Sequence, residues 1–498
     1  MRHGLTAGGY RGATSARLQR LTEETYRLRQ GTTLPSGCAN PNGALTLTNL
    51  MPPADRSSSP DGVEFTSLDA PPHTGRPFGA PAGIPETPDE ASARRFILQL
   101  AKQLHQHGTP AHRLEATLSV LANRLGIRAE FFSTPTSIMV GIGELEQQRV
   151  HLLRVEPGEP NLGHLSQLGA ITREVMAGTI TAAEGLQRID EMDAASPAYP
   201  RWLVLVAFVL ASTAIACFLK VRAGDAVVAA GLGLVTAITV LTASRWESTR
   251  HVTEPLAGFV VTTLAFTLDG VLGTRTGYAT SLAGLAILLP GLTFTVALTE
   301  LSTRHLASGT ARLSGAIVTF LGLGFGLALG AKAGGAAGEA LHHLLPMLDG
   351  ALPRTGLPSW AEWAGLLVAP LAFTVLLSAR HQDAPFIVIA CVAAYVTSKL
   401  AGAAVGEELG AFLGAFVVSA GSNVLARARQ RVAMVTQVPG LLILVPGSIG
   451  FRSVTSLLGQ EVESGIQAGF RVAIVGISLA AGILAGNVVT RAANRMRA

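Results

Sequence analysis

The sequence predicts a mainly α-helical, polytopic membrane protein with about ten transmembrane helices. We expect these helices to form two inverted five-helix repeats, preceded by a small soluble α+β domain. Three observations lead to this fold class. Only 14% of the 498 residues are charged, whereas soluble domains carry roughly 25%. Long apolar segments begin near residue 202, and short sequence motifs of the apolar half recur at a nearly constant spacing.

The N-terminal part is hydrophilic and divides by composition. Residues 1–90 are rich in Pro, Gly and Ser without a regular apolar pattern, which predicts a disordered tail. Residues 91–195 show the patterns of a folded soluble α+β domain. Phe96, Leu100 and Leu104 recur at helical spacing, and Thr109-Pro110 predicts an N-cap and first residue of a second helix.

The rest of this domain continues with strands and ends with helices. Strand-like segments are expected at 127–132, 137–142 and 150–155. Two closing helices follow, and Thr181 with Glu184 forms the pattern of a capping box at the start of the second. His112 and Glu115 lie one turn apart, but no complete ligand set surrounds them, so we expect no metal and no cofactor.

Ten apolar runs follow, and a membrane span needs roughly 20 apolar residues. The runs cover 202–219, 226–243, 256–269, 278–299, 313–331, 361–379, 384–400, 407–425, 432–448 and 469–490. Glycines repeat every fourth residue from Gly322 to Gly338, which predicts close helix packing.

Charge sets the expected orientation. The net charge is +5, and its basic excess lies in the apolar half, which indicates a lipid bilayer rather than nucleic acid as the partner. More loop and tail arginines fall on the side of the N-terminal domain, including Arg427, Arg429 and Arg431. The positive-inside rule therefore predicts a multi-pass protein of the cytoplasmic membrane, with the N-terminal domain and the C-terminus in the cytoplasm.

The apolar half repeats itself. Four pairs of similar segments keep one order and a spacing of 156 to 158 residues. They are Pro200-Arg-Trp202 with Pro358-Ser-Trp360, Asp225-Ala226 with Asp383-Ala384, Gly258–Val261 with Ala415–Val418, and Leu288–Gly291 with Leu444–Gly447. Repeats at 200–345 and 358–491 with five spans each would enter the membrane from opposite sides, an arrangement typical of secondary transporters. Duplication in a channel or a structural membrane protein is the alternative.

Matching helix breaks predict where a substrate would bind. Pro and Gly interrupt the fourth segment of each repeat, and freed backbone groups at such breaks bind substrates in transporters. The expected substrate-binding residues are Pro290, Gly291, Thr293, Thr295, Glu300, Pro446, Gly447, Ser448 and Arg452. A plain proline kink is the alternative.

Charges near the membrane supply candidates for proton coupling. Arg452 is suited to a substrate carboxylate, and Glu300 to an ammonium group or a proton. Glu300, Asp225 and Asp383 are the proton-coupling candidates, with an interfacial or purely structural role as the alternative.

Three groups of motifs resemble the bacterial threonine/serine exporter family. They are Gly108-Thr-Pro-Ala-His-Arg-Leu-Glu115; Thr134-Pro-Thr-Ser-Ile138 with Arg154-Val-Glu-Pro-Gly158; and Pro290-Gly291 followed by Glu300-Leu-Ser-Thr-Arg-His-Leu-Ala-Ser-Gly-Thr-Ala-Arg312. The resemblance covers roughly residues 91–490. It implies a bacterial protein, not an enzyme, that exports threonine and serine across the cytoplasmic membrane using the proton motive force.

Two other functions stay open from the sequence. Similar split systems are associated with succinate export, so a dicarboxylate is the alternative substrate. A membrane-anchored hydrolase with its chemistry in residues 91–195 is the second alternative, although no nucleophile motif is present there.

Overall fold

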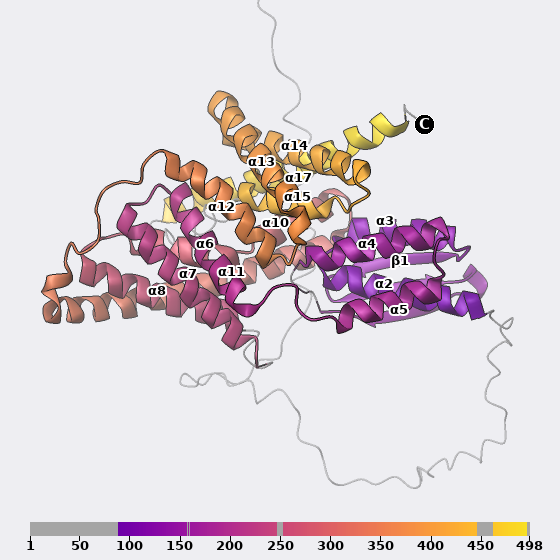
Figure 1. Cartoon of the computed structure of the whole chain (residues 1–498), viewed down its shortest axis with the longest axis horizontal. Helices are drawn as coiled ribbons and strands as arrows, with labels where there is room; N and C mark the ends of the chain where they lie inside the picture. Colours follow the sequence, from indigo (N-terminus) through magenta and orange to yellow (C-terminus); the bar gives the residue numbers. More distant parts are fainter. Residues whose placement is uncertain (1–87, 157, 159, 247–251, 446–461, 496–498) are drawn as a thin grey trace, which may run out of the picture. The chain divides into compact units, whose positions relative to one another are not determined.

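A computed structural model of the chain describes residues 88–156, 158, 160–246, 252–445 and 462–495. The described part is mainly helical, as predicted (Figure 1). The predicted tail lies outside the described residues except for its last three, 88–90, which already belong to the first helix. Pro446, Gly447, Ser448 and Arg452 also lie outside them, so the second predicted break has no structural description.

The N-terminal domain combines four helices with one small sheet. Its elements are α2 (Pro88–Gln106), α3 (Ala111–Arg124), β1 (Ala129–Thr134), β2 (Ser137–Ile142), β3 (Arg149–Arg154), α4 (Leu162–Ala177) and α5 (Ala182–Ala194). The strands are antiparallel in the order β1-β2-β3. The expected apolar faces form the core, where Phe96, Leu100, Leu114 and Leu118 are fully buried.

Two predicted helix starts have different outcomes. The capping box of α5 is confirmed, because the Thr181 hydroxyl accepts the N–H of Glu184 and the Glu184 carboxylate accepts the N–H of Thr181. The predicted N-cap at Thr109 is wrong. Pro110 occupies the N-cap position of α3, and no side chain of its own caps the helix.

The remaining helices form the apolar part. They are α6 (Arg201–Phe218), α7 (Ala223–Ala243), α8 (Thr253–Leu272), α9 (Gly277–Leu285), α10 (Gly291–Ser302), α11 (Leu306–Leu344), α12 (Trp360–Leu376), α13 (Ala384–Val405), α14 (Glu407–Ala428), α15 (Met434–Leu444) and α17 (Val462–Arg495).

The described residues include seven helices long and apolar enough to cross a membrane, or eight if the bent pair α9 and α10 is one span. This supports a multi-pass membrane protein. The expected ten spans are not all reproduced, because α12 has 17 residues, α15 has 11 and residues 446–461 lie outside the described part.

The helix order recurs in the two halves. In each half the first two helices pack together, and the third packs along the last, α8 on α11 and α14 on α17. The first helices of the halves, α6 and α12, lie antiparallel (Figure 1). Tyr199, before α6, donates to the carbonyl of Ala379, after α12, at 2.7 Å. At the opposite ends, Lys220 Nζ lies 3.5 Å from Glu362 Oε2.

The repeated glycines of α11 bring it close to α8, as their spacing predicts. Gly326, Gly330, Gly334 and Gly338 face the backbone of α8. A Cβ on Gly330 would lie only 2.7 Å from the carbonyl oxygen of Phe259. Only glycine allows this approach, so the stripe has a packing function.

Candidate functional site

A sharp break interrupts the fourth helix of the first half. A 3₁₀ turn over Ala286–Leu288 ends α9, and α10 starts at Gly291 with Pro290 as its N-cap. The two segments are bent by 55°. The first N–H groups of α10 have no acceptor within the helix, which makes this end suited to a negative group.

A cavity of about 580 Å³ lies beside this break. One wall comes from the first half, including Leu289, Pro290 and Thr293, and the other from the second half, including Leu442 and Val445. Val445 directly precedes the second predicted break. The cavity therefore lies between the two halves, beside the break of the first half and at the described end of α15.

The two predicted threonines of α10 differ in their exposure. Thr293 lines the cavity and is exposed. Thr295 is fully buried, and its hydroxyl donates to the carbonyl of Gly291 at 3.0 Å. Of the two predicted residues, only Thr293 is available to a substrate in this structure.

Three further polar residues line the cavity, Glu254, Thr319 and Tyr395, and the sequence analysis missed all three. Glu254 lies in the first turn of α8, which starts three residues before the predicted apolar run. Tyr395 of α13 donates through its hydroxyl to Glu362, which Lys399 also contacts. The Glu254-Pro255 pair was the available signal, because Pro favours the first turn of a helix and would have moved the start of this span.

Glu300 is fully buried and lies away from the cavity. Its Oε1 accepts the N–H of Ala111 at 2.8 Å, which caps α3 of the N-terminal domain. Its Oε2 accepts the hydroxyl of Ser308 at 2.7 Å and lies 3.2 Å from Nε of Arg312. The carboxylate thus binds three partners and connects α10, α11 and α3.

A second contact lies beside this one. His305 Nε2 lies 3.2 Å from Glu115 Oε2, and Oε1 of Glu115 accepts the N–H of Ser133 at 2.8 Å. Residues 108–115 and 300–312, two of the segments on which the family resemblance depends, therefore contact each other directly.

Asp225 and Asp383 occupy matching positions at the starts of α7 and α13. Each is buried, at 2% and 1% exposure. Asp225 Oδ2 lies 3.0 Å from Arg222 Nε, and its Oδ1 accepts the hydroxyl of Thr276 at 2.8 Å. Thr276 is the N-cap of α9. Asp383 pairs with Arg431, which shortly precedes α15. In each half, the aspartate therefore binds a residue at or shortly before the start of the fourth helix.

One group of the N-terminal domain has the composition of a metal site. His107, His164 and Asp193 offer ligand atoms within 4.8 Å of one another, the one such group among the described residues. His164 Nδ1 and His107 Nε2 lie 3.0 Å apart and share a hydrogen bond. Burial, with a smaller effect of His164, lowers the pKa of His107 to about 4. This hydrogen bond uses one ring nitrogen of each histidine, and the lowered pKa of His107 favours its neutral ring at pH 7.

The chain matches two protein-family models. A threonine/serine exporter model matches residues 95–333, and a second threonine/serine exporter model matches residues 362–489. The two matches cover the N-terminal domain and most of both halves of the apolar part. No solved structure matches the chain.

The chain is similar to curated membrane proteins of yeasts. Pheromone-regulated membrane protein 10 of Eremothecium gossypii is 26% identical over 396 residues, which is 78% of this chain and 52% of that protein. The proteins of the same name from Saccharomyces cerevisiae and Candida albicans are 28% and 27% identical, over 74% and 73% of this chain and 48% and 33% of theirs. The chain spans about half the length of these relatives, or less.

Proposed function

Because the chain belongs to the threonine/serine exporter family, we propose that it exports threonine and serine by secondary transport coupled to the proton motive force. The observation that carries this proposal is the cavity of about 580 Å³ between the two halves. Its volume suits a small ligand, and its wall includes Pro290 of the break.

The substrate carboxylate binds at the start of α10, near Gly291 and Thr293. The helix N-terminus favours a negative group there, and the Thr293 hydroxyl adds a hydrogen bond. Glu254 of α8, which also lines the cavity, accepts hydrogen bonds from the substrate ammonium. Thr295 and Glu300, whose polar atoms already have partners in the protein, position α10. By the sequence repeat, we propose the corresponding role for Pro446, Gly447, Ser448 and Arg452, which lie outside the described residues.

The two repeats are inverted and complete ten spans. The antiparallel packing of α6 on α12 supports this, since equivalent helices of inverted repeats run in opposite directions. Rocking of one half against the other opens the cavity to each side in turn.

Protons act at the buried carboxylates. Protonation of Asp225 weakens its contact with Thr276 and frees the start of α9, and protonation of Asp383 does the same for α15 through Arg431. Each half thus has its own proton-sensitive contact, which we call a latch, between the aspartate and the start of the fourth helix. Glu300 is the third candidate, because its charge is paired with Arg312.

The N-terminal domain and the C-terminus face the cytoplasm of a bacterium. The basic loop of Arg427, Arg429 and Arg431 supports this orientation, because the positive-inside rule assigns it to the cytoplasm. The domain packs at the same end, where Val432 reaches Gly169 of α4.

Counterflow of labelled threonine in proteoliposomes tests the transport proposal. We expect flux that increases with an imposed pH gradient and that Thr293→Trp, which fills the cavity, abolishes. Leu321→Trp, at an exposed position of α11, is the matched control and keeps its flux. Absence of threonine or serine flux in the wild-type protein would overturn the proposal.

The dicarboxylate alternative is separable in the same assay. The described lining of the cavity contains an acidic side chain, Glu254, which suits the ammonium group of a zwitterion and disfavours a second substrate carboxylate beside it. Succinate should therefore fail to compete with threonine. Hydrolysis by the purified protein, in contrast, would support the alternative of a membrane-anchored hydrolase.

A further inference from the structure

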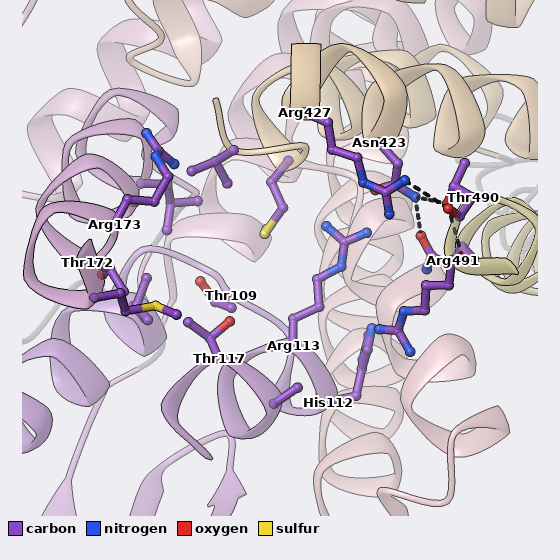
Figure 2. Close-up of a pocket in the computed structure, with 18 residues that line it drawn as sticks. Thr109, His112, Arg113, Thr117, Thr172, Arg173, Asn423, Arg427, Thr490 and Arg491 are labelled. Atoms are coloured by element: carbon purple, nitrogen blue, oxygen red, sulfur yellow. Dashed lines mark hydrogen bonds between the residues drawn. The ribbon is translucent and has the colours of Figure 1, made fainter. Parts of the chain in front are cut away.

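A second cavity, of about 410 Å³, lies between the N-terminal domain and the ends of three apolar helices. Its walls come from α3 and α4 on one side and from α14, α15 and α17 on the other (Figure 2). It shares no lining residue with the cavity beside Pro290. No part of the proposed transport function uses it.

The lining of this cavity is strongly basic. Four arginines contribute, Arg113, Arg173, Arg427 and Arg491, and the described lining residues include no carboxylate. Figure 2 shows the guanidinium of Arg113 pointing into the space between Arg427 and Arg491. Arg427 is held in place by its bond to the carbonyl of Thr490, at 2.8 Å, and Arg113 by its bond to Gln437, at 2.5 Å.

Neutral polar groups without partners line the same cavity. The Thr109 hydroxyl is buried, with 5% of the residue exposed, and has no hydrogen-bond partner among the described residues. Both ring nitrogens of His112 are buried and likewise lack a partner in the described part of the chain. Buried polar atoms are normally satisfied, so these groups point to a ligand that supplies the missing contacts.

The environment of the cavity disfavours positive charge on two of its own side chains, Arg113 and His112. Burial, with the help of Arg491, lowers the pKa of Arg113 to about 10. Burial, followed by Arg113, His305 and Arg491, lowers the pKa of His112 to about 3. Crowded cations and a neutral imidazole describe a site where an added negative charge would be strongly stabilised.

We propose that this cavity binds a small anion with at least two negative charges, through phosphate or carboxylate oxygens. Guanidinium groups bind both kinds of oxyanion in a bidentate manner, and hydroxyl and ring N–H groups complete the coordination. A zwitterionic amino acid fits poorly, because the described lining offers no carboxylate for its ammonium group. The ligand therefore differs in class from the proposed transport substrate.

The position of the cavity gives the anion a regulatory effect. An anion held by Arg113 of α3 and by Arg427 and Arg491 of α14 and α17 links the N-terminal domain to the second half. Such a link resists any movement that separates them, so occupancy alters the rate of transport.

Calorimetric titration of the full chain in phosphatidylcholine nanodiscs tests the proposal. This bilayer has no net negative lipid charge, so the added probe is the source of anions. The probes are pyrophosphate for phosphate oxygens, citrate for carboxylate oxygens and threonine as the zwitterion. We expect pyrophosphate, citrate or both to bind, and Arg113→Gln and Arg491→Gln each to raise the Kd by ~10-fold or more.

Arg429→Gln is the matched control, since Arg429 stacks on Phe386 outside the cavity and its loss changes the net charge equally. If Arg113→Gln does not fold, Thr109→Val removes one unpartnered hydroxyl with little change in shape and should still weaken binding. Failure of both anions to bind would overturn the proposal, as would equal losses in Arg113→Gln and Arg429→Gln. Threonine binding that depends on Arg113 would also overturn it. Threonine counterflow in the same variants tests transport separately.

Discussion

The N–H of Ala111 donates to Oε1 of Glu300 at 2.8 Å, across 189 residues of sequence. A carboxylate at the end of α10 thereby caps α3 of the N-terminal domain, a role that the helix would usually assign to its own N-cap side chain. The same α10 begins at the Pro290 break. One short helix therefore joins the proposed substrate site at its start to the N-terminal domain at its end.

Two substitutions at this contact between α10 and α3 should lower the stability of the protein by different amounts. Glu300→Gln leaves Arg312, 13% exposed, without its paired charge and should cost about 3 kcal/mol. Ala111→Pro keeps the helix start, where proline is favoured, but removes the donated N–H and should cost about 1 kcal/mol. Thermal unfolding in detergent measures both. Glu339→Gln, at an exposed position of α11, should leave the melting temperature unchanged, and an equal effect in all three would contradict the cap.

The glycine stripe of α11 predicts a strongly position-dependent response. Gly330→Leu should prevent correct folding, because its Cβ would meet the carbonyl of Phe259 at 2.7 Å. Gly335→Ala should be neutral or slightly stabilising, since nothing lies within 4 Å of the new Cβ and alanine favours helices. Yield of monodisperse protein after solubilisation distinguishes the two. Similar yields would show that α8 and α11 do not pack this closely.

The two threonines of α10 should separate substrate binding from helix packing. Thr293→Val removes a hydroxyl from the cavity and should raise the KM for threonine by roughly 5- to 10-fold. Thr295→Val removes a hydroxyl that is bonded within the helix and should leave KM close to the wild-type value. Counterflow at graded threonine concentrations measures the difference. The reverse order of effects would place the substrate elsewhere.

The proposed latches predict a loss of coupling without a loss of exchange. Asp225→Asn and Asp383→Asn mimic the protonated state, so threonine counterflow should persist while the response to a pH gradient falls. Glu362→Gln is a control, because this carboxylate also pairs with a basic residue, Lys399, but is not a coupling candidate. Gradient-dependent flux that survives in both aspartate variants would exclude these residues as proton carriers.

Acid should destabilise the N-terminal domain through His107, which is half-buried. Burial lowers the pKa of His107 from 6.5 to about 4, so the unfolded chain binds the proton more readily than the folded one. The contribution of His107 to the stability of the fold is complete above pH 6.5 and is lost as the pH falls toward 4. His107→Gln should flatten the fall of the melting temperature over this interval. His381→Gln, at an exposed position, should not, and an unchanged slope in His107→Gln would refute the assignment.

Local chemistry made much of the fold predictable. Apolar segments identify candidate membrane helices because hydrophobicity and length are properties of a single segment. The break at Pro290 follows from the missing N–H of proline, and the spacing of glycines in α11 predicts its approach to α8. The predicted start of α3 is wrong by one residue, because the carboxylate that caps this helix comes from Glu300, a partner that no local pattern reveals.

The sequence by itself determined the membrane character of this protein, the position of its first helix break and the core of its N-terminal domain. Only the tertiary structure decided which partner each charged side chain meets. It brings Glu300 to Ala111, sets Asp225 beside Thr276 and gathers arginines of α3, α4, α14 and α17 around one cavity. Hydrophobic burial is encoded residue by residue, whereas an electrostatic partner depends on distance in space, which folding alone creates.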